Sequence, residues 1–384
     1  MKKVLLIHNN YQIKGGEDTN LEEEIKFLKK NYELEVLLFD NSQRINVYDL
    51  VTFMTGRNLQ SDKKILKKIN KFNPDIVYIH NTWFKIGFGI FKLLEKKQIK
   101  TILKIHNFRY ECSRYWLLKN HIGSQDFCNA CALTKRKLVF FNKYFEDSFI
   151  KSVISIIFSK RYYKTLKHSP ISIAVISDFQ KEYLVNSGID SDKVFLHRNP
   201  FNFSVGKYIR YNSKSNFIVY AGRLTDSKGI EELLKAWVKL SINNIKLKIV
   251  GDGELNKTLQ KKYNINNVDF CGELNLNDTL DIIAGSRAVV TTTKMYEGQP
   301  RLLTEASFYC VPSIFPSFGG MGELFPNDYP LKFNQYNYSS LEDKLNLIQD
   351  STLLESLSVS VKNTIDNLLD ERVLNDSFER MIDK

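Results

Sequence analysis

A segment early in the second half of the chain places two cations between two glycines. It reads Gly222-Arg-Leu-Thr-Asp-Ser-Lys-Gly229, so that Arg223 and Lys228 are five residues apart. An apolar run of strand length precedes it and an amphipathic pattern follows, which predicts a turn between a strand and a helix. Such a turn can aim both cations at one diphosphate, and the N-terminus of the next helix adds a favourable dipole. A surface turn that only caps the helix is the alternative.

A second segment holds two carboxylates at a similar turn. Glu297 and Glu305 flank the sequence Gly-Gln-Pro-Arg-Leu-Leu-Thr, and the apolar run RAVVTTT lies just before them. Glu297 is therefore expected at the turn, and Glu305 about two turns into a helix. The backbone N–H groups from Gly298 to Leu302 would suit a negatively charged or hydroxyl-rich ligand. In the alternative, Glu297 caps the helix and Glu305 is simply a good helix former.

The elements around these segments predict an α/β fold with two doubly wound domains. Apolar runs of strand length alternate with helical patterns, which is typical of a parallel sheet covered on both faces. The alternation breaks near residues 200–215 and then resumes. We therefore expect one Rossmann-like domain over 1–205 and a second over 206–368. A final helix over 369–384 could pack back on the N-terminal domain. Ligands of such sheets bind beyond the carboxyl ends of the strands, so the domains would face each other across a cleft.

Four motifs in this order give the chain a recognisable resemblance. They are Gly222 to Gly229, the Val-Gly-Asp-Gly of Val250 to Gly253, the pair Glu297 and Glu305, and Gly319-Gly-Met-Gly-Glu323. Together they resemble the donor-binding domain of the family-4 retaining glycosyltransferases of GT-B fold. The resemblance implies that Arg223 and Lys228 bind the donor diphosphate and offset charge on the leaving group. It implies that Glu305 binds the ribose hydroxyls and Glu297 the hydroxyls of the transferred sugar, assisted by the amides of Gly298 to Leu302.

The resemblance also assigns residues in the N-terminal half. It places Gly15 and Gly16, after the first strand, in a glycine-rich loop near the donor phosphates and the acceptor. This loop is not a GxGxxG fingerprint, which disfavours a nicotinamide dehydrogenase. His106 ends the apolar run KTILKI and matches a family histidine that reaches the transferred sugar. A core or capping histidine is the alternative for His106.

Two short segments bear on the identity of the sugar donor and on whether a divalent metal is required. The family often has Phe-Gly-Leu where this chain has Gln299-Pro300-Arg301, so Pro300 lacks one N–H donor and Arg301 adds charge near the sugar. Asp190-Ser191-Asp192 spells the DxD motif of metal-dependent transferases, but its position after a helix and before the linker predicts an ordinary turn. The resemblance implies that no divalent metal is required and that the donor is linked to UDP or GDP.

Three cysteines lie close together in the first half of the chain. Cys128 and Cys131 have the spacing of zinc ligands, and Cys112 with His121 could complete a tetrahedral site. We favour the interpretation that these three cysteines are free thiols. With five cysteines in the chain and no signal peptide recognised, a reducing, cytoplasmic setting is expected.

Charge and aromatic residues concentrate in an insertion at about 108–168. The chain has a net charge of +12, which favours anionic partners, although a lysine-rich proteome would explain it equally well. Residues 135–167 contain nine Lys or Arg among aromatic residues, with Glu146 and Asp147 as the acids. We interpret this stretch as an interfacial helix that holds the protein peripherally on the anionic inner face of the plasma membrane. Nucleic acid is disfavoured for want of a recognised motif, and an ordinary surface helix remains the alternative.

These observations favour a retaining, metal-independent hexosyltransferase. It would move a sugar from a nucleotide-sugar donor to a lipid-linked or oligosaccharide acceptor in the synthesis of a capsule, an O-antigen or another cell-surface polysaccharide. A nucleotide-sugar 2-epimerase of the same fold is one alternative, and it would need acid and base groups on both sides of the sugar. A non-catalytic nucleotide-sugar-binding subunit is the other, although such a protein would have no reason to keep all four charged residues.

Overall fold

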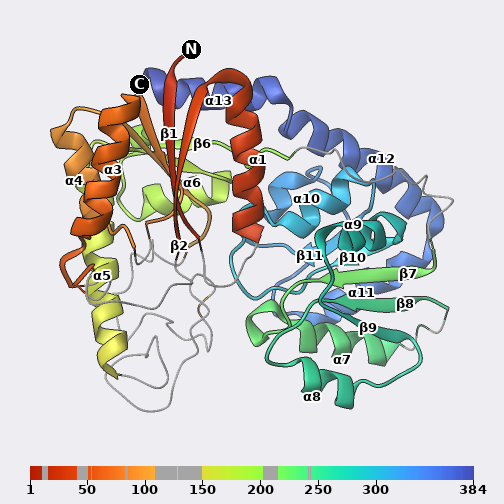
Figure 1. Cartoon of the computed structure of the whole chain (residues 1–384). Helices are drawn as coiled ribbons and strands as arrows, with labels where there is room; N and C mark the ends of the chain where they lie inside the picture. The colour runs from red at the N-terminus through yellow and green to blue at the C-terminus, as the bar shows by residue number, and fades with distance from the viewer. Residues whose placement is uncertain are drawn as a thin grey trace. The chain divides into compact units, whose positions relative to one another are not determined.

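The computed structural model describes residues 1–10, 16–40, 51–52, 54–82, 85–108, 128, 149–201, 215–240, 242 and 244–384. The chain forms two compact units (Figure 1). Unit 1 comprises Met1–Phe201 together with Glu371–Lys384, and unit 2 comprises Asn202–Asp370. Among the described helices, none is both long enough and apolar enough to cross a bilayer.

Unit 1 is built on a six-stranded parallel sheet in the order β2-β1-β3-β4-β5-β6. Its elements are β1 (Lys3–Asn10), α1 (Gly16–Asn31), β2 (Glu33–Asp40), α3 (Leu59–Phe72), β3 (Ile76–Ile79), α4 (Gly89–Lys96), β4 (Lys100–Ile105), α5 (Phe149–His168), β5 (Ser172–Val175), α6 (Asp178–Asn186), a 3₁₀ turn (Ser191–Lys193), β6 (Val194–Leu196) and α13 (Glu371–Asp383).

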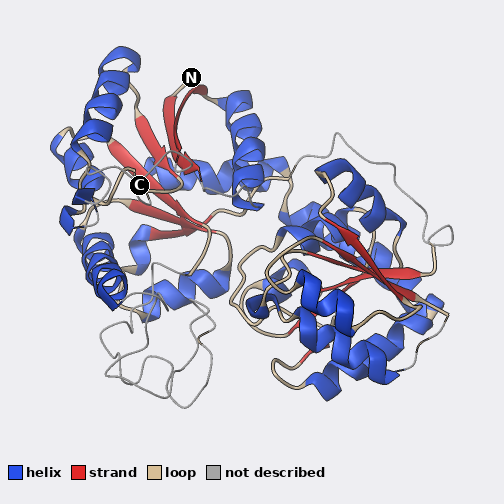
Figure 2. Ribbon diagram, turned by 60° about the horizontal axis from the view of Figure 1, so that its bottom comes forward, coloured by secondary structure: helices blue, strands red, loops and turns tan. Residues whose placement is uncertain are grey.

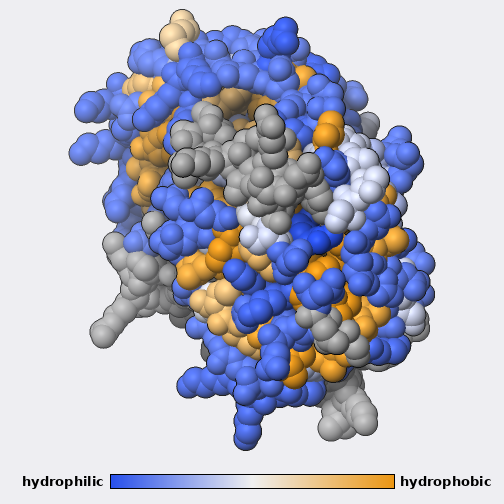
Figure 3. Space-filling view, turned by 90° about the vertical axis from the view of Figure 1, so that its right-hand side faces the viewer, coloured by the Kyte–Doolittle hydropathy of each residue, from blue (hydrophilic) through white to orange (hydrophobic). Residues whose placement is uncertain are grey.

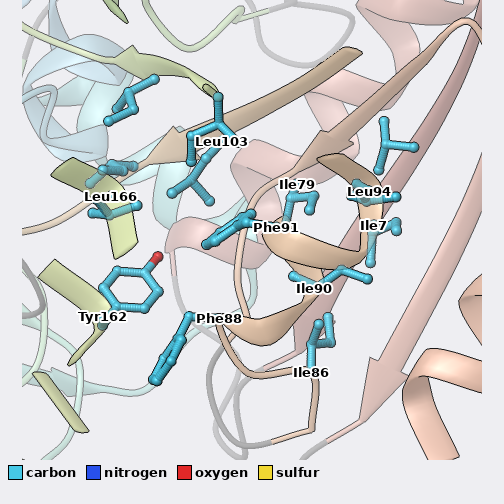
Figure 4. Packing of buried hydrophobic residues seen from close by; sticks show 14 of the residues in the cluster. Ile7, Ile79, Ile86, Phe88, Ile90, Phe91, Leu94, Leu103, Tyr162 and Leu166 are labelled. Atoms are coloured by element: carbon cyan, nitrogen blue, oxygen red, sulfur yellow. The ribbon is translucent and has the colours of Figure 1, made fainter. Parts of the chain in front are cut away.

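Each face of the sheet in unit 1 has its own hydrophobic core, because side chains alternate along buried strands. One face packs against α3, α4 and α5, with Ile90, Phe91 and Leu94 of α4 at its centre (Figure 4). The other face packs against α1 and α13, and α13 supplies Leu374, Phe378 and Met381. The last helix of the chain is therefore part of the core of the first unit.

Unit 2 has a six-stranded parallel sheet in the order β12-β11-β10-β7-β8-β9, with helices on both faces (Figure 2). Its elements are β7 (Phe217–Ala221), a 3₁₀ turn (Asp226–Lys228), α7 (Ile230–Leu240), β8 (Lys246–Val250), α8 (Asn256–Lys262), β9 (Val268–Gly272), α9 (Leu276–Gly285), β10 (Ala288–Val290), α10 (Arg301–Phe308), β11 (Ser313–Pro316), a 3₁₀ turn (Met321–Leu324), β12 (Lys332–Phe333), α11 (Tyr338–Asn346), a 3₁₀ turn (Leu347–Gln349) and α12 (Ser351–Leu368).

The strand orders locate the point in each sheet where ligands are expected. In unit 1 the chain runs from β1 outward to β2 and then returns to β3 on the other side of β1. In unit 2 it runs from β7 to β8 and β9, and then returns to β10 on the other side of β7. Loops that leave two adjacent strands in opposite directions open a crevice at the carboxyl edge of the sheet. The fold thus singles out the ends of β1 and β3 in one unit, and of β7 and β10 in the other.

The prediction of two Rossmann-like α/β units is confirmed, and the apolar runs KTILKI and RAVVTTT contain β4 and β10. The two-residue strand β12 was not predicted, because it is too short to show a periodic pattern. On the face of the molecule seen in Figure 3, hydrophilic residues dominate and hydrophobic ones lie scattered among them, as on most folded proteins.

Candidate functional site

The two charged segments found in the sequence meet at the switch point of unit 2. The loop after β7 and the loop after β10 are joined by a hydrogen bond from Lys294 N to Ser227 O at 2.9 Å. Thr292 Oγ1 also donates to Gly229 O at 2.6 Å. Gly229 has a φ of 65°, and a Cβ at this position would lie 2.0 Å from Thr292 O. The close approach of the loops therefore requires glycine at 229.

The two cations of this site, Arg223 and Lys228, differ in whether a carboxylate is paired with them. Lys228 Nζ lies 2.5 Å from Glu297 Oε1, and each side chain is a quarter exposed. Thr293 Oγ1 lies 3.5 Å from the same carboxylate oxygen. Arg223 is exposed, and none of the described residues pairs with its guanidinium group. The site thus offers one open cation beside a second cation that a carboxylate already orients, and both can engage a diphosphate.

The second carboxylate, Glu305, is held on α10. Its side chain is 5% exposed, and its Oε1 accepts a hydrogen bond from Arg301 Nε at 2.6 Å. Burial raises the pKa of Glu305, and the nearby Arg301 partly opposes this rise. Pro300 is the N-cap of α10 and gives it no side-chain hydrogen bond, so the first turn presents N–H groups without intrahelical acceptors. An ion pair at the start of a helix whose dipole favours anions suits a polar, hydroxyl-rich ligand.

The other two motifs support the loops that carry these charges. Gly251 has a φ of 130°, and a Cβ there would lie 2.1 Å from Gly222 O, so glycine lets the loop after β8 contact the loop after β7. After β11, Gly320 N donates to Glu297 O at 2.8 Å and fixes the backbone of that acid. All four motifs of the sequence therefore lie at one edge of one sheet, where the structure brings them into mutual contact.

Unit 1 presents histidines at the equivalent edge. His8 lies in β1, His80 directly follows β3 and His106 directly follows β4. His106 Nε2 and His80 Nδ1 form a hydrogen bond of 3.1 Å, and the His8 and His80 rings are 6.2 Å apart. Burial holds the pKa of His80 and that of His106 well below the ordinary value. We term His8, His80 and His106 the histidine row, and at neutral pH His80 and His106 are uncharged.

A fully buried ionic cluster lies beside the histidine row. Glu24 of α1 accepts hydrogen bonds from Lys104 Nζ at 2.6 Å, from Tyr78 OH at 2.9 Å and from His197 Nε2 at 3.0 Å. Burial alone would raise the pKa of Glu24, but Lys104 and His197 hold it well below the ordinary value. His197 Nδ1 is 2.6 Å from Ser377 Oγ of α13. The last helix of the chain thus completes a polar network inside unit 1.

Most of these histidines were not singled out from the sequence, although a signal exists. The tripeptide Ile-His-Asn ends three separate apolar runs, at His8, His80 and His106, and Leu-His-Arg-Asn ends a fourth at His197. A residue type repeated at the carboxyl ends of parallel strands must gather at one edge of the sheet. Glu24 and Lys104 carry no such signal, because a charged residue within a lysine-rich sequence gives no hint of complete burial.

Several predicted residues lie outside what the structure describes. Gly15, Cys112, Cys131 and His121 are not among the described residues, and the described part of Gly16 is its backbone at the start of α1. Cys128 is partly exposed and forms no disulfide with a described cysteine. No group of three or more His, Cys, Asp or Glu in the described ranges is arranged to hold a metal ion.

The described part of the basic insertion corrects one detail of its interpretation. Phe158, Tyr162, Tyr163 and Leu166 of α5 belong to the core of unit 1, as Figure 4 shows for Tyr162 and Leu166. The apolar stripe of this half of α5 therefore packs on the sheet and is not available to a lipid surface. Lys160, Lys164 and Lys167 of the same helix are exposed, as are Ile150 and Ile157.

The DxD-like sequence forms the turn that was expected. Asp190 caps a 3₁₀ turn over Ser191–Lys193, and its side chain accepts a hydrogen bond from Asp192 N at 3.0 Å.

Comparison with known proteins agrees with the geometry of unit 2. Residues 207–363 match the family model described as glycosyl transferases group 1. Over these residues the chain is similar to glycosyl transferases group 1. One curated relative is the amylovoran biosynthesis glycosyltransferase AmsD of Erwinia amylovora, 28% identical over 165 residues, which are 41% of this chain and 46% of that protein. The alignments with curated relatives cover 41 to 59% of the lengths of those proteins.

Solved structures match over the whole chain and identify the fold as GT-B. Anabaena Alr3699/HepE in complex with UDP and glucose has a TM-score of 0.66 at 13% identity, with 100% of both chains covered. The lipopolysaccharide outer core galactosyltransferase WaaB has a TM-score of 0.64 at 15% identity, with 99% of both chains covered. At these identities the likeness concerns the fold.

Proposed function

We propose that this protein is a retaining, metal-independent glycosyltransferase. It moves a hexose from a UDP- or GDP-linked donor to a lipid-linked saccharide in the synthesis of a cell-surface polysaccharide. The observation that carries the proposal is the meeting of two segments at the switch point of unit 2, one with Arg223 and Lys228 and the other with Glu297 and Glu305, in the part of the chain that matches glycosyl transferases group 1.

Each side chain has a part that its chemistry suits. Arg223 and Lys228 bind the diphosphate, while Glu297 orients Lys228 and contacts hydroxyls of the transferred sugar. Glu305 accepts hydrogen bonds from the ribose hydroxyls, and Arg301 keeps its carboxylate in place. His106 of unit 1 contacts the transferred sugar, as the family resemblance implies.

The family resemblance implies the course of the reaction. The bond between the anomeric carbon and the phosphate oxygen breaks, and negative charge grows on the diphosphate. The two cations and the N-terminus of α10 stabilise this charge. The acceptor hydroxyl attacks from the face that the phosphate leaves, and its proton passes to a phosphate oxygen. Because the protein supplies these positive groups itself, no divalent cation is needed.

The named relatives support this class of reaction. AmsD is a biosynthetic glycosyltransferase for amylovoran, and WaaB is a galactosyltransferase of the lipopolysaccharide outer core. HepE was solved with UDP and glucose. A nucleotide-sugar donor and a saccharide acceptor are the simplest extension of these properties to this chain.

The test is donor binding and turnover across UDP-, GDP-, ADP- and dTDP-sugars in the presence of EDTA. Wild type should bind and turn over one donor, and Arg223→Ala should lose it. Arg287→Ala is the matched control, because Arg287 lies before β10, at the opposite edge of the sheet, where it pairs with Asn216 and Ser351. If wild type binds no nucleotide sugar, the proposal fails. If turnover appears only after metal is restored, metal independence fails.

A lipid-linked acceptor requires the protein to reach a membrane, and unit 1 carries a suitable surface. Exposed lysines of α3 (Lys63, Lys64, Lys67 and Lys71) and of α5 (Lys160, Lys164 and Lys167) belong to helices that cover the same face of the sheet. Each basic residue near an anionic leaflet contributes about 1 kcal/mol of attraction. We propose peripheral binding to the inner face of the plasma membrane through these lysines, with Ile150 and Ile157 as apolar contacts.

A further inference from the structure

The contact between His106 and its neighbour His80 is a polar arrangement in the interior of unit 1 that the proposed reaction leaves unused. His80 is 4% exposed, and its Nδ1 faces His106 Nε2 at 3.1 Å. The Tyr78 ring packs edge-on against His80 with ring centroids 4.6 Å apart, and His8 lies on another side. Packing of this kind fixes the ring of His80, so the direction of its Nδ1 is fixed as well.

The hydrogen bond couples the proton positions of the two rings. Two neutral imidazoles share one hydrogen atom in such a bond, so one ring must donate and the other accept. The protonation state of His106 Nε2 therefore decides whether His106 Nδ1 is a donor or an acceptor. His106 Nδ1 and His80 Nε2 have no hydrogen-bond partner among the described residues. His106 Nδ1 is itself buried, and whether it carries a hydrogen depends on the bond to His80.

Nearby charges keep the pair neutral. Lys104 is fully buried and lies two residues before His106 on the same face of β4. Its positive charge lowers the pKa of both histidines, in addition to the larger effect of burial, while Glu24 opposes it. A neutral His106 can serve as a donor or as an acceptor of hydrogen bonds, whereas a charged one can only donate.

We propose that His80 is a positioning residue that holds the ring orientation of His106 and couples the tautomer of His106 to its own. The inference rests on the proposed function, because His106 is the residue that touches the transferred sugar. His80 itself touches no substrate and acts through His106. A misplaced ring weakens contacts that matter most in the transition state, so the effect falls mainly on kcat and little on the donor KM.

Two substitutions of similar polarity separate positioning from mere packing. The amide of Asn occupies the place of the Nδ1 atom of histidine, so His80→Asn keeps a hydrogen bond to His106. The amide of Gln extends to the place of Nε2, so His80→Gln loses that bond and keeps a polar group. His168→Gln, at the exposed end of α5, is the surface control. Thermal melting establishes that each variant is folded.

The experiment combines kinetics with ¹⁵N NMR of the histidine rings in the full chain, assigned with His106→Gln. We expect His80→Gln to lower kcat about tenfold or more with the donor KM within about twofold, and His80→Asn to stay within about threefold of wild type. The tautomer populations of the His106 ring should be similar in wild type and in His80→Asn and should differ in His80→Gln.

Equal kcat in His80→Gln and wild type, or equal losses in both variants, overturns the proposal. If wild type turns over no nucleotide sugar, the proposed function fails, and the NMR spectra alone decide whether His80 sets the tautomer of His106. A tautomer that is the same in wild type and in His80→Gln then refutes the positioning role.

Discussion

The switch points of the two units lie in sheets of similar architecture but use opposite chemistry. In unit 2, exposed or partly exposed charges stand on glycine-bearing loops, as with Arg223, Lys228 and Glu297. In unit 1, the neutral His80 and His106, one buried and one partly buried, directly follow strands and are backed by the ionic pair of Glu24 and Lys104. All six histidines of the chain lie in unit 1, and unit 2 has none. This contrast fits our proposal that one unit binds the anionic diphosphate and the other contacts uncharged hydroxyls.

The largest expected effect is on the stability of unit 1 and comes from breaking the buried ion pair of Lys104 and Glu24. Lys104→Met leaves Glu24 charged without its cation, so unit 1 should lose about 3–5 kcal/mol of unfolding free energy. Native-state hydrogen exchange of peptides from β3 and β4 measures this loss. The double variant Lys104→Met with Glu24→Gln should recover much of it. Lys239→Met in unit 2 breaks an exposed pair with Glu342 and should cost less than about 1 kcal/mol. Similar losses from both lysines would remove the distinction between the units.

Among the effects on catalysis, the largest is expected from substitutions at the charged edge of unit 2. Lys228→Ala removes one of the two cations that we propose stabilise the leaving diphosphate, so kcat/KM should fall about 10²- to 10³-fold. Steady-state kinetics with the identified donor give the value, and unchanged melting shows that the fold is intact. The control is Lys246→Ala at the start of β8, which pairs with Asp269 away from the site. A loss from Lys246→Ala as large as that from Lys228→Ala would contradict the assigned role.

Substitutions of exposed lysines should weaken membrane binding when they lie in unit 1 but not when they lie in unit 2. Lys160→Glu with Lys164→Glu on α5 should weaken sedimentation with vesicles of anionic lipid about thirtyfold or more, from about 1 kcal/mol for each lysine. Lys257→Glu with Lys261→Glu on α8 has the same spacing and exposure in unit 2, and it should have little effect. Equal weakening by both pairs would show that binding follows net charge and not a surface of unit 1.

The smallest expected effect is a loss of folding stability in unit 1 at acidic pH. The pKa of His80 is lower in the folded protein than its unfolded value near 6.5, so the unfolded chain binds more protons below that value. The stabilisation is thus complete above pH 6.5 and declines as pH falls toward the folded pKa, by up to about 1.4 kcal/mol per pH unit for each such histidine. Hydrogen exchange at pH 6.5 and 5.5, corrected for intrinsic rates, should show this decline in β1, β3 and β4. His80→Asn should reduce its slope, and β7, β8 and β10 should show no such decline. A decline of the same size in both units would refute the histidine origin.

Much of unit 2 could be predicted from the sequence because its site is local. Arg223 and Lys228 lie in one turn, and Glu297 and Glu305 lie in another, so their spacing carries the chemistry. The interpretation of α5 was less accurate. Its apolar and basic residues are interleaved, and periodicity could not tell whether Phe158 and Tyr162 face lipid or a core.

By itself, the sequence determined the alternation of strands and helices, the two-unit organisation and the charged turns of unit 2. These depend on apolar spacing and on residues that are neighbours along the chain. Only the tertiary structure decided that His80 meets His106, that Lys104 is fully buried against Glu24, and that α13 closes the core of unit 1. Parallel pairing aligns the ends of strands that are far apart in sequence, and burial then sets the protonation of what meets there.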